Sequence, residues 1–419
     1  MAKVVVVSVG YWGDVMPFVP IADELVTRGH EVVLAVPEGF HEVLADNRFD
    51  LVHLGTHFSP RELQQHGDLF GRAHTIAGMR AAGGLLYPLL IHPAREIASV
   101  LTDLDADLFV SHRMTACLTQ LVSEPAGIPL VVGDLHPMGI QSVEQPMPLL
   151  PLPRLPGLQH LTNRAGWAVC QRIVARMFDD DLSALRAERG LQRRPSFSGW
   201  QACDQILLLC SEHYWPRCSD WPDHLAYTGF TVWGDPNAAL PTGLDAYLDA
   251  GDPPVLITLG TSAATNARDA FHLAAEAAEV LGLRPLLLVG SERNLNTLHG
   301  RADAWTFAPL PAVLPHCQAV VHAAGHGTVA AALTAGTPQV VMPQIVDQVT
   351  HSARLTALGV GVVVPWKRRS VNRIAAALSH VLADPAVTAN TRKMAALLAG
   401  EHGPRTAADA IEKVLAAAG

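Results

Sequence analysis

The sequence comprises 419 residues, of which 49% are hydrophobic and 16% are charged, and its formal net charge is −9. This composition is typical of a folded protein with a sizeable core and excludes a disordered chain, and the length allows two domains. The negative charge argues against a nucleic-acid partner, which would require a basic surface.

Cysteine usage and hydropathy indicate in which cellular compartment the protein is expected. The six cysteines form no CxxC pair and have no regular spacing, which indicates reduced thiols in a cytoplasmic protein. No apolar run approaches the roughly 20 residues of a membrane-spanning helix, and the N-terminus lacks a signal-peptide pattern. We therefore expect a cytoplasmic protein without a membrane span. Both a monomer and a homodimer are compatible with the sequence.

Strand and helix patterns alternate through the N-terminal half. Residues 3–10 form an apolar, β-branched run typical of a buried strand, residues 17–29 follow as a helix, and residues 30–37 form the next strand. The same alternation returns between residues 107 and 134. Strands that alternate with helices in this way predict a parallel sheet covered by helices on its faces.

Two irregular segments precede a second alternating region, the first of them a linker or a binding loop and the second a domain linker. Residues 144–157 are rich in proline and fit neither a helix nor a central strand, and residues 230–253 show a composition shift typical of a linker. Directly afterwards a strand is predicted over 255–260, a helix over 267–282 and a strand over 284–290. The second half therefore repeats the architecture of the first.

These patterns predict an α/β protein with two Rossmann-like, doubly wound domains. We expect an N-terminal domain over residues 1–229, a linker over 230–253, a C-terminal domain over 254–400, and a helix over 401–419 that packs back on the N-terminal domain. Two such domains facing each other would place a cleft between the carboxyl ends of their strands, where sheets of this kind bind ligands.

The strongest local signal lies between residues 322 and 348, which read HAAGHGTVAAALTAGTPQVVMPQIVDQ. A strand at 317–321 leads through small residues into a helix at 328–336. Free backbone N–H groups and the macrodipole at such a helix start favour an anion, and phosphate is the obvious candidate. His322 and His326 also have the i, i+4 spacing of a metal pair, but they lack an intervening glutamate and an evident third ligand, so no metal is expected.

This stretch resembles the donor-binding motif of the GT-B nucleotide-sugar glycosyltransferases that glycosylate bacterial natural products and sterols. Residues 10–32, GYWGDVMPFVPIADELVTRGHEV, are similar to the Gly-x-x-Gly-Asp-Val-x-Pro opening of that family. DWPDHLAYTGF at 220–230 resembles the rhamnolipid-forming rhamnosyltransferases, as does the Met-Pro-Leu stretch after residue 145. The resemblance covers most of the chain. It implies an inverting sugar transfer between two domains facing a cleft, without a metal or other cofactor.

The resemblance also implies a donor site in the C-terminal half. The matched positions are His322, Gly325, His326, Gly327, Thr328, Thr261 and Ser262 for the diphosphate, Phe307 and Ala308 for the base, and Asp347 and Gln348 for the sugar. Two positions depart from the family pattern, because Ala324 stands where glycine is usual and His326 where a small residue or asparagine is usual. Asp347 could also cap the helix that follows it.

Two apolar residues bear on the choice of nucleotide. In relatives that use UDP-sugars, a glutamate eight residues after the first histidine commonly holds the ribose hydroxyls, and that position is Ala330 here. Leu310 likewise replaces a polar residue often found beside the base. Without these groups nothing demands a 2′-hydroxyl, so a dTDP-sugar is favoured over a UDP-sugar.

The resemblance places the catalytic base at Asp14, in the N-terminal opening. A base is needed to take the proton of the acceptor hydroxyl, although Asp14 could instead be a helix N-cap. His112 and His136 are further candidates near the acceptor, and the second member of any dyad stays open. Segments 56–92 and 136–160 are apolar, which predicts a lipophilic acceptor such as a natural product, polyketide, phenolic compound or lipid.

Two other functions are compatible with the same motifs. A nucleotide-sugar epimerase of this fold would bind a donor without needing an apolar acceptor pocket. A non-catalytic partner that binds a sugar nucleotide would explain the departures at Ala324, His326 and Ala330. Retention of Asp14 together with the donor-site residues argues against the second alternative.

Overall fold

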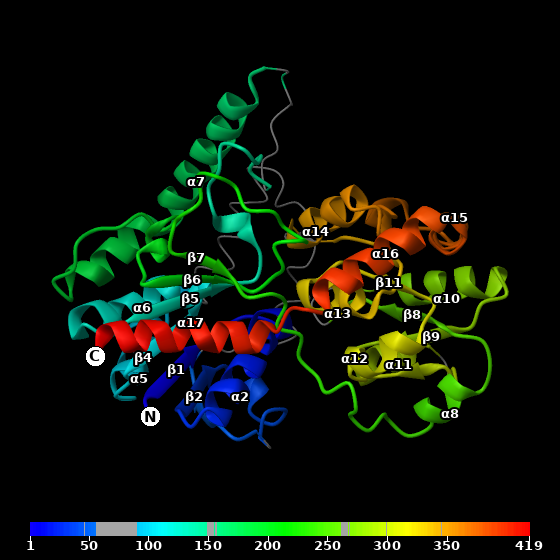
Figure 1. Ribbon diagram of the computed structural model, residues 1–419, viewed down its shortest axis with the longest axis horizontal. Coiled ribbons are helices and arrows are strands. Elements are labelled where there is room, and N and C mark those ends of the chain that lie inside the picture. The colour runs from blue at the N-terminus through cyan, green and yellow to red at the C-terminus, as the bar shows by residue number, and fades with distance from the viewer. Residues whose placement is uncertain are drawn as a thin grey trace. The chain divides into compact units, whose positions relative to one another are not determined.

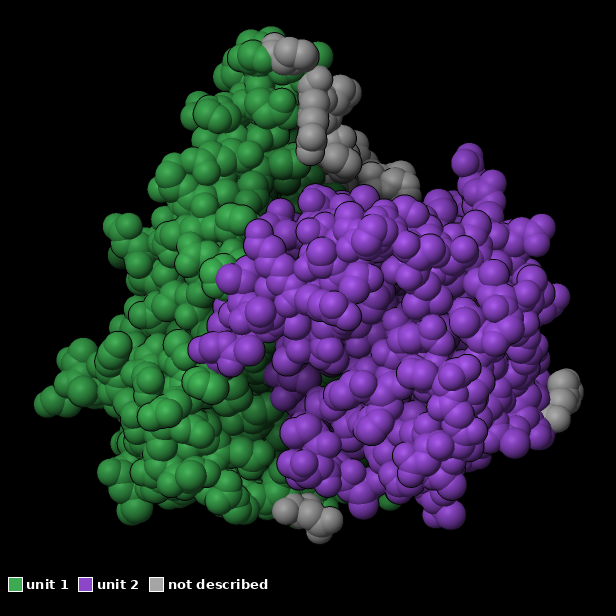
Figure 2. Space-filling model, turned by 45° about the vertical axis from the view of Figure 1, so that its right-hand side comes forward, with its two compact units in different colours: residues 1–231, 402–419 green, residues 232–401 purple. Residues whose placement is uncertain are grey.

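The computed structural model describes residues 1–45, 47–55, 90–148, 155, 157–260, 267, 269–298, 300–344 and 346–419. The chain forms two compact units, which Figure 2 distinguishes by colour: residues 1–231 with 402–419, and residues 232–401. The second unit begins at Val232, inside the segment predicted as a linker. That segment contains helix α8 (Leu244–Asp249). Leu244 and Leu248 of this helix pack into the apolar core of the second unit, which explains why the segment folds with it.

The first unit contains a seven-stranded parallel sheet in the order β3-β2-β1-β4-β5-β6-β7 (Figure 1). Its strands are β1 (Lys3–Val7), β2 (Glu31–Val36), β3 (Asp50–His53), β4 (Leu108–His112), β5 (Leu130–Asp134), β6 (Gln205–Leu208) and β7 (Leu225–Tyr227). The central strands β4 and β5 are buried along their whole length, as expected for a parallel sheet covered on both faces.

Helices and short 3-10 turns connect the strands of the first unit. They are α1 (Trp12–Val15), η1 (Met16–Phe18), α2 (Val19–Thr27), η2 (Glu38–Phe40), α5 (Ala94–Thr102), α6 (Arg113–Ala126), η3 (Pro137–Gly139), α7 (Gln159–Ala187), η4 (Gly199–Gln201) and α17 (Gly403–Ala418). The helix predicted over 17–29 is divided into η1 and α2, with Pro17 and Pro20 in the first turns of these two elements.

The second unit contains a six-stranded parallel sheet in the order β10-β9-β8-β11-β12-β13. The strands are β8 (Val255–Thr258), β9 (Pro285–Leu288), β10 (Ala304–Trp305), β11 (Ala319–His322), β12 (Gln339–Val341) and β13 (Gly361–Val363). Besides α8, its helical elements are α10 (Ala270–Val280), α11 (Glu292–Thr297), α12 (Leu310–Val313), η5 (Leu314–His316), α13 (His326–Ala335), α14 (Val346–Ala357), η6 (Trp366–Arg368), α15 (Val371–Ala383) and α16 (Pro385–Leu398). The predicted doubly wound α/β architecture is confirmed. Among the described helices, none combines the length and apolarity needed to cross a bilayer.

The C-terminal helix α17 completes the first unit by packing against α2. Its apolar face buries Ala407, Ala408 and Ile411. At its start Gly403 lies so close to the backbone carbonyl of Phe230 that a Cβ at this position would collide with it. The chain therefore leaves and re-enters the first unit at neighbouring points.

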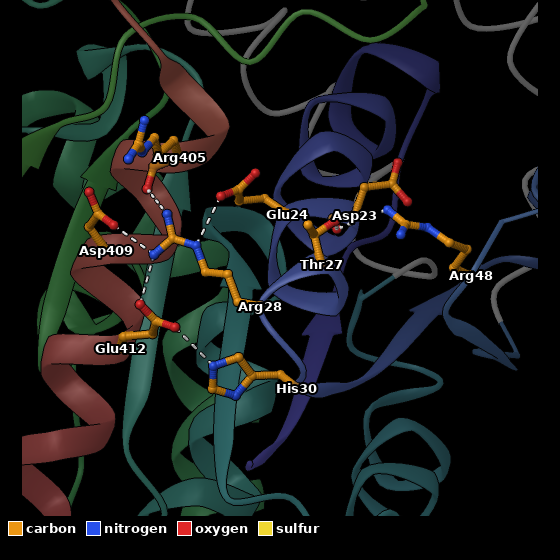
Figure 3. A network of polar contacts seen from close by, with 9 residues as sticks. All are labelled: Asp23, Glu24, Thr27, Arg28, His30, Arg48, Arg405, Asp409 and Glu412. Carbon is orange, nitrogen blue, oxygen red and sulfur yellow. Dashed lines mark hydrogen bonds and ion pairs between the residues drawn. The ribbon is translucent and has the colours of Figure 1, made fainter.

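A network of charged side chains joins α17 to the end of α2 (Figure 3). The Arg28 guanidinium contacts Asp409 at 2.6 Å, Glu412 at 2.7 Å and Glu24 at 2.9 Å. His30 Nε2 lies 3.1 Å from the second carboxylate oxygen of Glu412. Since one largely buried guanidinium serves three carboxylates, the arginine is ordered once for several ion pairs.

We expect Arg28→Met to lower the thermal midpoint, because methionine keeps much of the buried stem but leaves three carboxylates without their cation. Thermal unfolding followed by circular dichroism at low and high salt checks this, and the difference from wild type should shrink as salt screens the network. Lys3→Met, which removes a single exposed ion pair with Glu31, is the matched control. A wild-type midpoint for Arg28→Met at low salt would contradict the prediction.

Candidate functional site

The predicted anion site lies at the start of α13, at the carboxyl end of the buried strand β11. The helix begins at His326, with Gly325 as an N-cap that offers no side-chain hydrogen bond. A Cβ built on Gly325 or Gly327 would meet no described atom within 4 Å outside its chain neighbours and its own helix. The first-turn N–H groups of His326, Gly327 and Thr328 have no capping side chain, which suits an anion such as phosphate.

His322, which the resemblance assigns to the diphosphate, ends β11 directly before the turn into α13. Its side chain is fully buried at the end of β11, where Nδ1 accepts a hydrogen bond from the Ala324 N–H at 3.1 Å and Nε2 lies 3.0 Å from Gln339 Oε1. Because Nδ1 is an acceptor, the ring proton lies on Nε2 and is donated to Gln339. Burial lowers the pKa of His322 to about 4, so the ring is neutral. In this structure His322 holds the turn before α13, and both its nitrogens are bonded within the protein.

That turn contains a strained residue, since Ala324 has a φ of +66°. Only glycine adopts this left-handed region without a steric cost. The strain explains the family preference for glycine at this position.

We expect Ala324→Gly to raise the free energy of unfolding by about 1 kcal/mol, because it relieves the left-handed strain. Urea unfolding measures the change. Ala323→Gly is the control, since its buried neighbour Ala323 has no positive φ and should become less stable. A loss of stability in Ala324→Gly would contradict the prediction.

The predicted sugar-binding residues lie in the first turn of α14, after β12. The helix begins at Val346, so Asp347 lies inside the first turn, and the alternative that it is an N-cap is wrong. Burial raises the pKa of the half-buried Asp347 to about 6, so its carboxyl group is mostly ionised at neutral pH. Gln348 is buried, and its Oε1 accepts a hydrogen bond from the Gln344 N–H at 2.8 Å. Gln348 therefore shapes the loop, while Asp347 offers acceptor oxygens.

The predicted base-binding segment follows the edge strand β10. Phe307 is 46% exposed, which is unusual for a large apolar ring, whereas Ala308 is buried. The ring of Trp233 lies 6.0 Å from that of Phe307, measured between centroids. Sequence reasoning missed Trp233, because it lies in the segment interpreted as a linker. An exposed ring that lies against a half-buried one suits a planar base.

Two further donor-site residues, Thr261 and Ser262, lie outside the described residues. Gly260 before them is described and follows β8 with a φ of +67°. This left-handed conformation favours glycine.

Asp14 lies beyond the carboxyl end of β1, in the third position of α1, so it is not the N-cap of that helix. Its Oδ2 accepts a hydrogen bond from the Tyr11 N–H at 2.8 Å, and its backbone carbonyl accepts one from the Ser8 hydroxyl at 2.9 Å. Gly10 has a φ of +136°, and a Cβ there would collide with the Asp14 carboxylate. The local chain is built to hold this carboxylate in place.

The acceptor candidates His112 and His136 are both buried near the same edge of the first sheet. His112 ends β4 and packs edge-on against Phe18, with ring centroids 5.7 Å apart, while His136 follows β5. Next to them in the chain is an ion pair that the sequence analysis missed: Nε of the half-buried Arg113 is 3.0 Å from Oδ2 of the buried Asp134. Burial raises the pKa of Asp134, and Arg113 opposes this shift. The available signal was an aspartate at the last position of a predicted strand.

A second missed residue is His351, on α14 one turn after Asp347. It is buried, and its ring centroid lies 5.7 Å from that of His326. A pair of neighbouring imidazoles, one from each helix, therefore lies near the starts of α13 and α14.

Comparison with known proteins shows which family the region containing α13 and α14 is similar to. Residues 289–414 match the family model for the erythromycin biosynthesis protein CIII-like C-terminal domain. The chain is 28% identical to the O-mycaminosyltylonolide 6-deoxyallosyltransferase of Streptomyces fradiae, with 98% of this chain and 97% of that protein covered. It is 29% identical to the 4'-demethylrebeccamycin synthase of Lentzea aerocolonigenes, with 99% of both covered.

Solved structures resemble the whole chain at low sequence identity. The kitacinnamycin glycosyltransferase has a TM-score of 0.75 at 18% identity, covering 99% of both chains. The spinosyn rhamnosyltransferase SpnG has a TM-score of 0.71 at 19% identity, covering 98% of this chain and 100% of its own. SsfS6 of Streptomyces sp. SF2575, complexed with thymidine diphosphate, has a TM-score of 0.67 at 20% identity, covering 99% and 100%. These likenesses confirm the predicted GT-B fold.

Proposed function

We propose that this chain, a glycosyltransferase of the GT-B fold, moves a sugar from a nucleoside diphosphate sugar to a hydroxyl of an apolar small molecule, with inversion at the anomeric carbon. The observation that carries the proposal is the order of groups along the carboxyl edge of the second sheet. The exposed Phe307 follows β10, the uncapped start of α13 follows β11, and Asp347 follows β12. Base, diphosphate and sugar would lie along this edge in that sequence.

The distance between the strands that carry these groups supports this arrangement. The strands β10 and β11 are three places apart in the sheet, which corresponds to about 14 Å between their carboxyl ends. That span is on the scale of an extended nucleoside diphosphate. The carboxylate of Asp347 would accept hydrogen bonds from sugar hydroxyls.

The start of α13 would stabilise the leaving group. As the bond from the anomeric carbon to the diphosphate oxygen breaks, negative charge grows on that oxygen, and the N–H groups of Gly327 and Thr328 with the helix dipole would stabilise it. A metal ion forms no part of this proposal, so chelation by EDTA is expected to leave turnover unchanged.

Asp14 would act as the general base in the first unit. Its carboxylate would take the proton of the acceptor hydroxyl while the oxygen attacks the anomeric carbon from the face opposite the diphosphate. Relatives named for transfer to a tylonolide and for a rebeccamycin synthase support a lipophilic acceptor. Acceptor-dependent release of the nucleoside diphosphate would separate a transferase from an epimerase.

A dTDP-sugar is the favoured donor. Ala330 is buried in α13 and Leu310 packs on an apolar cluster, so neither offers a partner to a 2′-hydroxyl. The structural neighbour bound to thymidine diphosphate supports this choice.

Calorimetric titration with dTDP and UDP tests the donor site. We expect tighter binding of dTDP, and Phe307→Ala should weaken it about tenfold by removing the stacking surface. Val280→Ala, which truncates an exposed residue at the end of α10, is the control and should bind like wild type. Preference for UDP would reject the dTDP assignment, and absence of binding to both would reject the donor site.

A further inference from the structure

The imidazoles of His326 and His351 connect the two helix starts of the candidate donor site. His326 is the first residue of α13, and His351 lies in the second turn of α14. Their exposed fractions are 5% and 1%, and their rings are tilted by 54° at 5.7 Å. Two polar rings are therefore buried beside the place proposed for a diphosphate.

The surroundings of His351 disfavour the charged form of its imidazole. The pKa of His351 is lowered well below its usual value, first by burial and then by His326 and His322. Two imidazolium ions at this separation would repel each other, so the pair can hold one proton at most near neutral pH.

Among the described elements that pack on α13 and α14, a small number of charged groups lie near the pair. On α14 itself, Asp347 and Arg354 lie one turn to either side of His351, and His322 ends the adjacent strand β11. His322 is neutral and bonded to Gln339. Neither α12, which packs on α13, nor β13, which packs on α14, carries an ionisable side chain.

The remaining ionisable groups on packed elements lie near the opposite end of α13. His316 belongs to η5, whose Leu314 carbonyl bonds to Thr337 beyond the helix end. On α16, Arg392 lines a cavity with Gly336, and Lys393 follows it. The helix is about 15 Å long, so these groups contribute little at its start.

We propose that the His326–His351 pair takes up a proton from solvent when a nucleoside diphosphate binds at the start of α13. The inference rests on the function proposed above. Binding would place two or more negative charges beside two buried imidazoles, and an anion at short range favours the charged form of an imidazole. The resulting imidazolium would add a charge-assisted hydrogen-bond donor to the N–H groups of the helix.

Calorimetry with dTDP in buffers of different ionisation enthalpy measures this proton directly. At pH 7.5 the terminal phosphate of dTDP is almost fully ionised, because its pKa lies near 6. Any uptake therefore comes from the protein, and we expect about 0.5 to 1 proton per dTDP bound. Binding of dTDP with the same heat in every buffer would overturn the inference while leaving the donor site intact. Failure of dTDP to bind would instead reject the proposed function.

Variants locate the proton. The double variant His326→Asn/His351→Asn should bind dTDP more weakly and with no uptake, whereas His316→Asn, at the far end of α13, should keep the wild-type value. Thermal unfolding verifies that each variant is folded. Undiminished uptake in a folded double variant would overturn the assignment to this pair. Should the double variant fail to fold, NMR of the imidazole protons of wild type replaces it. If no histidine signal shifts toward the protonated position on addition of dTDP, the inference is overturned.

Discussion

Replacing Asp14 by asparagine is expected to lower turnover by about 10²- to 10⁴-fold, the contribution typical of general acid–base catalysis. The asparagine side-chain oxygen can still accept the hydrogen bond from the Tyr11 N–H, so the start of α1 should keep its conformation. What is lost is the ability to take a proton from the acceptor. Because the candidate donor residues belong to the second unit, the affinity for dTDP should stay within error of wild type.

The matched control is Asp50→Asn, at the amino end of β3 and therefore at the opposite edge of the same sheet. It should leave turnover unchanged. Release of nucleoside diphosphate with acceptor present measures both variants. Wild-type turnover in Asp14→Asn would show that another group takes the proton, and the buried His112 and His136 would be the next residues to replace.

Replacing His322 by alanine should have the largest effect on stability, at about 3–5 kcal/mol. The change leaves a cavity under the β11–α13 turn and removes the partners of the Ala324 N–H and of Gln339 Oε1. The turn that aims the first N–H groups of α13 would lose its support, so dTDP binding should weaken with stability.

His322→Asn separates the two hydrogen bonds. The asparagine oxygen can accept from the Ala324 N–H, as Nδ1 does, while Gln339 loses its donor. Its loss of stability should therefore be smaller than that of the alanine variant. His272→Ala on the exposed face of α10 is the control for loss of a histidine. Urea unfolding and calorimetry with dTDP report the two effects, and an alanine variant as stable as wild type would contradict the buried role of His322.

Most of the fold could be predicted because buried parallel strands are apolar runs with sharp ends. The runs at 3–10, 128–134 and 255–260 all contain strands, although each strand is shorter than its run. The long helix α7 was missed. Its buried residues follow a helical period from Asn163 to Ile173 and again from Leu182 to Arg186. The helix between these two stretches is exposed or half-buried, so no continuous apolar stripe marks it.

The parts of the candidate site that are formed by local backbone conformation could be predicted from the sequence. The parts that depend on contacts between residues far apart in the chain could not. Small residues before an Ala-rich helix predicted the start of α13, because that signal is local. The burial of His322 depends on Gln339 across the neighbouring strand, and the contact between His326 and His351 depends on the packing of two helices. Neither contact has a signature in sequence spacing.

The close approach of Gly403 to Phe230 has a consequence for how the protein is made. The second unit is inserted into the first between two adjacent points, so the first unit lacks α17 until residues 403–418 have been synthesised. During synthesis the inserted unit can fold while the face of α2 that receives α17 is still bare, which reverses the usual order in which N-terminal domains fold first. Closing so long a loop costs little more than closing a shorter one, since loop entropy grows only with the logarithm of length. For the same reason a short bridge from Thr231 to His402 should excise residues 232–401 and leave a smaller protein that retains the seven-stranded sheet.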